Sequence, residues 1–76
     1  KPDAVLGLLY RSESREVLML ANCSQQAVEV LLPQLAEGYW SPILEDKLYQ
    51  DGLHGGKDAR LALSGYGYRW FSRSLS

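Results

Sequence analysis

The strongest structural signal in this sequence lies in residues 4–22, AVLGLLYRSESREVLMLAN. Two runs rich in apolar residues, Ala4–Arg11 and Arg15–Asn22, lie on either side of the polar triplet Ser12-Glu13-Ser14. Short runs with β-branched and aromatic members, bounded by polar clusters, are typical of strands. We therefore predict a β-hairpin with a short loop.

The second strand of this hairpin has apolar residues on both faces. Side chains alternate along a strand, so Val17, Met19 and Ala21 lie on one face and Leu18 and Leu20 on the other. An antiparallel strand with one face in water carries polar residues at every second position. Two interpretations fit: a central strand covered by loops or another sheet, or a strand whose second face docks against a partner domain.

The rest of the chain predicts more strands. We expect them at Ala27–Leu32, Tyr39–Glu45, Arg60–Ser64 and Gly67–Arg73, with Pro42 marking an edge or a bulge. The glycine-rich segment Asp51–Asp58 is predicted to be a loop. No segment keeps a helical spacing. The fold class that we predict is all-β, an antiparallel, Greek-key-like β-sandwich of about six to eight short strands.

Length, charge and cysteine content limit the function. At 76 residues the chain has room for one core, so we expect residues 1–76 to be a single domain. A net charge of −1 argues against a nucleic-acid partner, and the apolar runs are too short to span a membrane. One cysteine and one histidine are too few for a disulfide or a zinc site, so we expect no metal and no cofactor. Because the chain begins with Lys1, we expect it to belong to a longer protein, which we place in the cytoplasm.

The residues with reactive side chains do not form a catalytic pattern. The adjacent acids Glu45 and Asp46 are not in a recognisable glycosidase frame, and His54 has no nucleophile in a known turn context. Gly55-Gly56-Lys57 lacks the rest of a phosphate-binding loop, and Cys23 has no cationic neighbour to activate it. We therefore predict no catalytic residue in this chain.

The triplet Asn22-Cys23-Ser24 has two interpretations. It matches a glycosylation sequon. Its asparagine and serine side chains also suit hydrogen bonds to the backbone of a tight turn, which is the simpler role.

The aromatic residues have two interpretations. Tyr39 and Trp40, with Tyr49, are candidates for a platform on which a sugar stacks, whereas aromatic side chains also fill small cores. In the segment SGYGYRWF, residues 64–71, we expect Tyr68 and Trp70 to point inward and Arg69 and Phe71 to face solvent or a partner domain. We expect Tyr66 to bond its hydroxyl to backbone, and Trp70→Ala to cost roughly 3–5 kcal/mol. The residues predicted to form the core are Leu9, Leu18, Leu20, Val28, Val30, Leu61, Leu63, Tyr68 and Trp70.

In their order along the chain these segments resemble the C-terminal β-sandwich domain of the alpha-amylase family of glycoside hydrolases and transglycosylases. The resemblance covers the opening strand Val5–Arg11, the strand and Asn-x-Ser turn Leu18–Ser24, and the strand Ala27–Val30. It continues through Gly38-Tyr39-Trp40 to the closing segment Leu61–Trp70. Ser64-Gly65 stands where such domains usually have a proline before the tyrosine.

The resemblance implies a non-catalytic accessory domain. In that family the catalytic carboxylates lie on a (β/α)8 barrel, so none is transferred to this chain. It implies that the parent acts on an α-glucoside and that this domain stabilises the catalytic barrel by packing against it, with α-glucan as a further candidate partner. Two alternatives stay open: a carbohydrate-binding module with an aromatic platform, and an interaction domain that self-associates when isolated.

Overall fold

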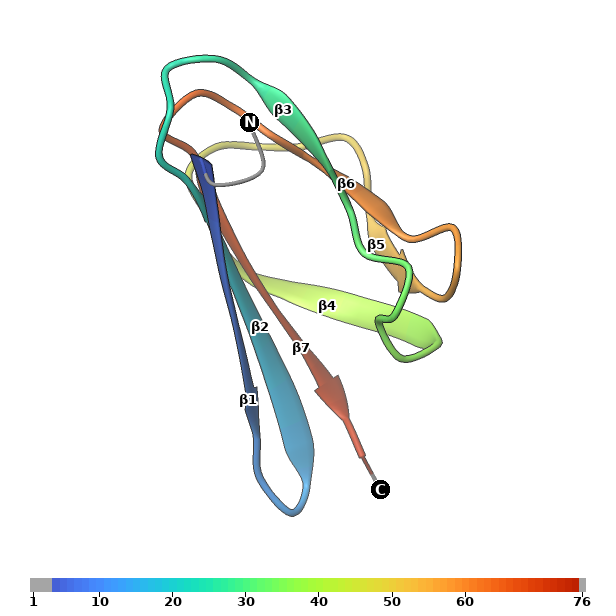
Figure 1. The fold of residues 1–76 in the computed structure, drawn as a ribbon. Coiled ribbons are helices and arrows are strands. Elements are labelled where there is room, and N and C mark those ends of the chain that lie inside the picture. The colour runs from blue at the N-terminus through green and yellow to red at the C-terminus, as the bar shows by residue number, and fades with distance from the viewer. Residues whose placement is uncertain (1–3, 76) are drawn as a thin grey trace.

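The computed structural model describes residues 4–75, and within this range the chain forms seven β-strands and no α-helix (Figure 1). The all-β prediction is confirmed, and so is the opening hairpin. The strands are β1 (Val5–Arg11), β2 (Arg15–Asn22), β3 (Val28–Leu31), β4 (Gly38–Glu45), β5 (Leu53–Gly55), β6 (Arg60–Leu63) and β7 (Tyr68–Ser74).

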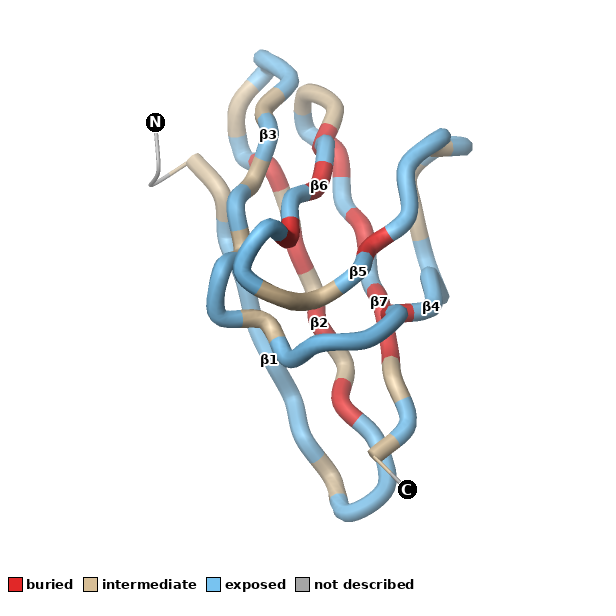
Figure 2. The backbone as a smooth tube through the Cα atoms, turned by 90° about the vertical axis from the view of Figure 1, so that its right-hand side faces the viewer, coloured by how far each residue is buried: buried red, intermediate tan, exposed pale blue. Residues whose placement is uncertain are grey.

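The strands form two antiparallel sheets. The larger has the order β1-β2-β7-β4-β5, and the smaller consists of β3 and β6. Figures 1 and 2 show the small sheet lying over one face of the large sheet. The large sheet curls, so that β5 contacts β6 on one side of the molecule. On the other side, β1 and β3 are both edge strands, and this side of the sandwich is open.

The predicted loop Asp51–Asp58 is wrong in part, because it contains the short strand β5. Gly55 makes this pairing possible: a Cβ there would collide with the carbonyl oxygen of Ala36, so only glycine fits against the neighbouring chain. β5 pairs with the start of β4, with Gly55 opposite Gly38 and Leu53 opposite Trp40. The predicted irregularity at Pro42 is present, because the register of β4 against β7 shifts between Pro42 and Leu44.

Leucines and two aromatic side chains fill the core between the sheets. Its buried members are Leu18, Leu20, Trp40, Leu53, Ala59, Leu61, Leu63 and Phe71. Val28 and Val30 are half-buried and pack against this cluster. Figure 2 shows the buried residues concentrated along β2, β6 and β7, whereas β1 is exposed along most of its length. The prediction for Leu9 is therefore wrong: it lies on an edge strand that the small sheet does not cover, and it is 52% exposed.

The prediction for β7 is inverted. The alternation was right, but Tyr68 and Trp70 point outward, 39% and 37% exposed, whereas Arg69 and Phe71 are 1% and 0% exposed. The physical reason is that distant carboxylates and carbonyls neutralise the Arg69 guanidinium inside the sandwich. An arginine with such partners can occupy an inward position that hydrophobicity alone would give to an aromatic residue.

Asn22 fixes the turn that follows β2. Its amide nitrogen donates to the carbonyl oxygens of Gln26 at 2.8 Å and Ser64 at 3.0 Å, and its side-chain oxygen accepts the Ser24 N–H at 3.0 Å. The predicted turn role is confirmed, and it joins the β2–β3 turn to the β6–β7 turn. The predicted hydroxyl contact of Tyr66 is wrong. That side chain is exposed and has no hydrogen-bond partner among residues 4–75. The Tyr66 backbone is left-handed, with φ 54°.

Candidate functional site

The densest group of charges surrounds Arg69 inside the sandwich. Its Nε donates to Glu45 at 2.7 Å and its Nη1 donates to the Asp51 carboxylate at 2.7 Å. Further bonds go to the carbonyl oxygens of Ala62 and Asp51 at 2.9 and 3.1 Å. The guanidinium also lies over the ring of Tyr49, 3.8 Å from its centroid. Arg69 comes from the large sheet and Ala62 from the small one, so this cluster joins the two sheets.

Two carboxylates near Arg69, those of Asp51 and Asp46, have a pKa below the ordinary value. Burial alone would raise the pKa of Asp51, but hydrogen bonds from the Ala62 amide and Arg69, with the charge of Arg69, hold that pKa below its ordinary value. Asp46 is similar: burial opposes ionisation, but the hydroxyls of Ser64 and Tyr49 and the Tyr68 amide lower its pKa. A general acid needs a raised pKa, so both carboxylates have the environment of structural anions.

The candidate sugar platform does not assemble. Trp40 is 0% exposed, and its indole N–H donates to the carbonyl oxygen of Ala36 at 3.0 Å. Tyr49 lies under Arg69, and its hydroxyl is engaged with Asp46 at 2.7 Å. Of the three platform candidates, Tyr39 is the exposed one. Its ring centroid lies 5.3 Å from that of His54, and the two rings are tilted by 51°. These three aromatic residues therefore do not share one surface.

The outer face of the large sheet, the face turned away from the small sheet, carries the most continuous apolar surface. The strand register sets its side chains in rows, because residues paired across an antiparallel ladder share a face. One row is Leu6, Ala21 and Tyr68, and the next is Leu8, Met19, Trp70 and Leu44. Tyr10 and Val17 begin a third row, which continues to Ser72. The apolar members of the outer face are Leu6, Leu8, Tyr10, Val17, Met19, Ala21, Leu44, Tyr68 and Trp70.

The inner face of the same strands carries most of their charges. Arg11, Glu16 and Arg73 form one cross-strand row, in which Arg73 donates to Glu16 at 2.7 Å. Arg69 and Glu45 are paired in another. The three outer rows, in contrast, contain no charged side chain, and Arg15 lies beyond them at the end of the outer face, opposite Ser74.

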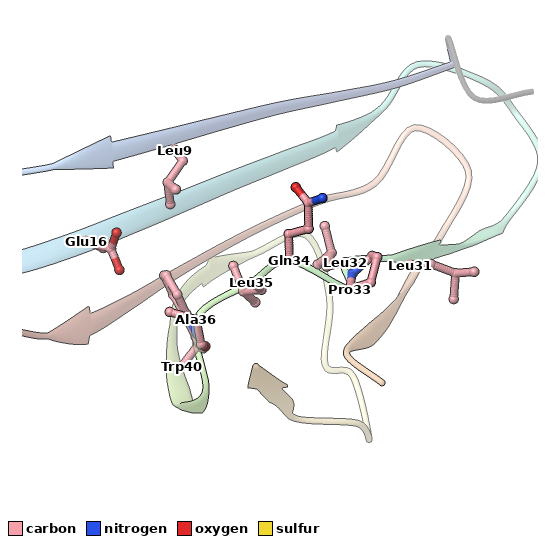
Figure 3. A pocket seen from close by; sticks show the side chains of 9 residues that line it. All are labelled: Leu9, Glu16, Leu31, Leu32, Pro33, Gln34, Leu35, Ala36 and Trp40. Carbon is pink, nitrogen blue, oxygen red and sulfur yellow. The ribbon is translucent and has the colours of Figure 1, made fainter. Parts of the chain in front are cut away.

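A groove runs between β1 and β3 on the open side of the sandwich. Two adjoining depressions of about 560 and 530 Å3 make up this groove, and both are lined by Leu31 and Leu32. Figure 3 shows the first, in which Leu9 and Glu16 form one wall and the segment from Leu31 to Ala36 forms the other. The groove is mostly apolar, and the edges of β1 and β3 bound it.

The remaining candidates stand apart from these surfaces. Cys23 is exposed, and His54 lies in β5, paired with Tyr39 of β4. Among residues 4–75 no group of histidine, cysteine and acidic side chains is arranged to hold a metal ion. None of the described segments is a helix with the length and hydropathy needed to cross a membrane.

These features define a class of protein: a small antiparallel β-sandwich with an internal ionic cluster and an apolar outer face on its larger sheet. Residues 15–72 match the family model described as "Sucrose hydrolase-like, C-terminal domain", and the chain belongs to that family. The match is consistent with the C-terminal domain of an alpha-amylase-family enzyme. No curated protein and no solved structure matches the chain significantly.

Sequence reasoning missed two of these features. It placed Arg69 in solvent or against a partner domain, because the residues that neutralise it come from three other segments. The β2 part of the outer face was predicted, because apolar residues on both faces of β2 indicated that its second face is covered. The β7 part, Tyr68 and Trp70, would follow from pairing β7 with β2 in the observed register.

Proposed function

We propose that this chain is the non-catalytic C-terminal accessory domain of a sucrose hydrolase-like enzyme and that it stabilises the catalytic domain by packing against it. The observation that carries the proposal is the exposed apolar surface. Among residues 4–75, eight hydrophobic residues form the buried core, whereas twelve large hydrophobic residues are exposed, among them Leu6, Leu8 and Leu48. A soluble monomer rarely exposes large contiguous apolar patches, and such patches mark interaction sites.

The family supports the identity of the partner and of the parent's substrate. A C-terminal domain is joined to the rest of its parent by the polypeptide itself, so the catalytic domain is the partner that is always present. The family description names sucrose hydrolase-like proteins. Sucrose contains an α-glucosyl unit, which supports a parent that acts on an α-glucoside.

Removal of the domain from the parent enzyme tests this role. We expect the truncated parent to unfold at a lower temperature than the intact parent, because the catalytic domain loses the cover of its apolar contact surface. The measurement is differential scanning calorimetry of the catalytic domain's transition. A catalytic domain that unfolds at the same temperature with and without this chain would show that the chain does not stabilise it.

A further inference from the structure

We infer that the catalytic domain of the same parent chain docks on the outer face of the large sheet, with Trp70 at the centre of the contact. This inference rests on the accessory role proposed above. It adds which of the two apolar surfaces makes the contact and what chemistry the partner surface must offer.

The composition of the outer face matches the core of a protein–protein interface. Interface cores are depleted in charged residues and enriched in aromatic residues and methionine. The three outer rows contain Tyr10, Met19, Tyr68 and Trp70 and no charged side chain, and the one charge of β2 on this face, Arg15, lies at its end, opposite Ser74. Glu16, Arg69 and Arg73 turn inward, where they form ion pairs, and Arg15 lies beyond the three rows, so docking over these rows would not bury an uncompensated charge.

Trp70 is the anchor of this surface. In the register it lies between Met19 of β2 and Leu44 of β4, in the middle of the longest outer row. Its indole N–H has no acceptor among residues 4–75, although a tryptophan N–H usually finds a partner when it is buried. Beside it, Leu6, Leu8 and Met19 help to line a shallow apolar depression of about 230 Å3. The partner surface must therefore offer an apolar side chain for this depression and an oxygen acceptor for the indole.

The connection of the chain favours the catalytic domain over a second copy. In a C-terminal domain the preceding domain is joined through the residues before β1, and β1 itself carries Leu6, Leu8 and Tyr10 of the outer face. A covalent tether makes the contact intramolecular, which raises the effective concentration of the tethered domain. A second copy of the chain has no such advantage.

The groove between β1 and β3 suits a different kind of occupant. It is concave, two strand edges bound it, and Glu16 and Glu29 stand in its walls. A groove of this shape can admit a single extended segment, whereas a folded domain needs a broad surface such as the outer face. The groove therefore provides the matched control for an experiment on the outer face.

A pair of lysine substitutions in the intact parent enzyme separates the two surfaces. Leu8 on the outer face is 61% exposed and Leu31 at the groove is 66% exposed, so neither substitution should disturb this domain's own core. We expect Leu8→Lys to shorten the thermal unfolding half-life of the catalytic domain roughly tenfold or more, because it buries a charge in the contact. Leu31→Lys should leave that half-life unchanged. Hydrogen exchange of the β2 and β7 amides checks that the domain stays folded in both variants.

Trp70→Phe provides a second test of the same contact. It keeps a ring but removes the indole N–H, and we expect a smaller loss of half-life than for Leu8→Lys, in the same direction. If Leu31→Lys shortens the half-life and Leu8→Lys does not, the groove is the contact, and the surface assignment is wrong while the accessory role stands. If neither substitution nor removal of the domain has an effect, both proposals fail. If Leu8→Lys only converts a dimeric parent into a monomer in sedimentation, the occupant is a second copy and the inference is overturned.

Discussion

At the scale of single residues, the burial of the two tryptophans differs from what their neighbours in the sequence indicate. Trp40 follows a tyrosine and a glycine in what resembles an exposed aromatic pair, yet it is fully buried and bonded to Ala36. Trp70 stands in the aromatic closing segment, yet over a third of it is exposed. Local sequence cannot separate these cases, because alternation defines two faces without saying which of them meets the second sheet.

The tryptophans therefore differ in what they contribute to the stability of this chain. We expect Trp40→Ala to lower the free energy of unfolding by about 3–5 kcal/mol, since it opens a large cavity and leaves the Ala36 carbonyl without its indole donor. We expect Trp70→Ala to cost only about 1–2 kcal/mol, because its side chain is partly solvated already. This corrects the larger cost expected for Trp70 from the sequence. Urea denaturation of both variants measures the difference, and equal losses would contradict the observed burial.

At the scale of elements, the sequence predicted what depends on local pattern. The hairpin of β1 and β2 and the bulge near Pro42 follow from apolar runs and proline chemistry. The leucines at 18, 20, 61 and 63 are buried. What local pattern does not contain is the Arg69 cluster, whose members come from β4, the segment before β5, β6 and β7. Only the completed sandwich brings these groups together.

The Arg69 cluster makes the joining of the two sheets dependent on pH. Asp46 and Asp51 have pKa values below their ordinary value in the folded chain, so their contribution to stability is complete above the unfolded pKa and is lost as pH falls through the folded pKa. We expect the free energy of unfolding to be nearly constant above about pH 5 and to decline below about pH 4. Urea titrations across this range measure the decline.

A matched pair of variants separates this effect from general acid unfolding. Asp51→Asn should lower the free energy of unfolding by about 1–2 kcal/mol at neutral pH, because it weakens a charged hydrogen bond to Arg69, and should make the acid decline shallower. Asp58→Asn, a change at an exposed acid on the other side of β5 for which no hydrogen bond or ion pair is found among residues 4–75, should leave both unchanged. If the two variants have the same acid profile, Asp51 is not the group that couples the sheets to pH.

At the scale of the whole molecule, polar connections and apolar contacts lie on opposite sides. The Arg69 cluster and the hydrogen bonds of Tyr49, Asp46 and Ser64 connect the sheets near β4, β6 and β7. On the side of β1 and β3 the groove separates the two edges, and its walls are mostly apolar. The sandwich is therefore held firmly along one side and weakly along the other.

This asymmetry predicts an order of local opening. β2 and β7 are paired on both sides, whereas β3 is paired only with β6 and has no fully buried side chain. Strands with one partner and little buried apolar surface open at lower free energy than central strands. We expect the hydrogen-bonded amides of β3 to exchange with deuterium at least about tenfold faster than those of β2 and β7 under native conditions, with β6 in between. Amides of β3 that exchange only at the rate of global unfolding would show that the open side is as firmly held as the Arg69 side.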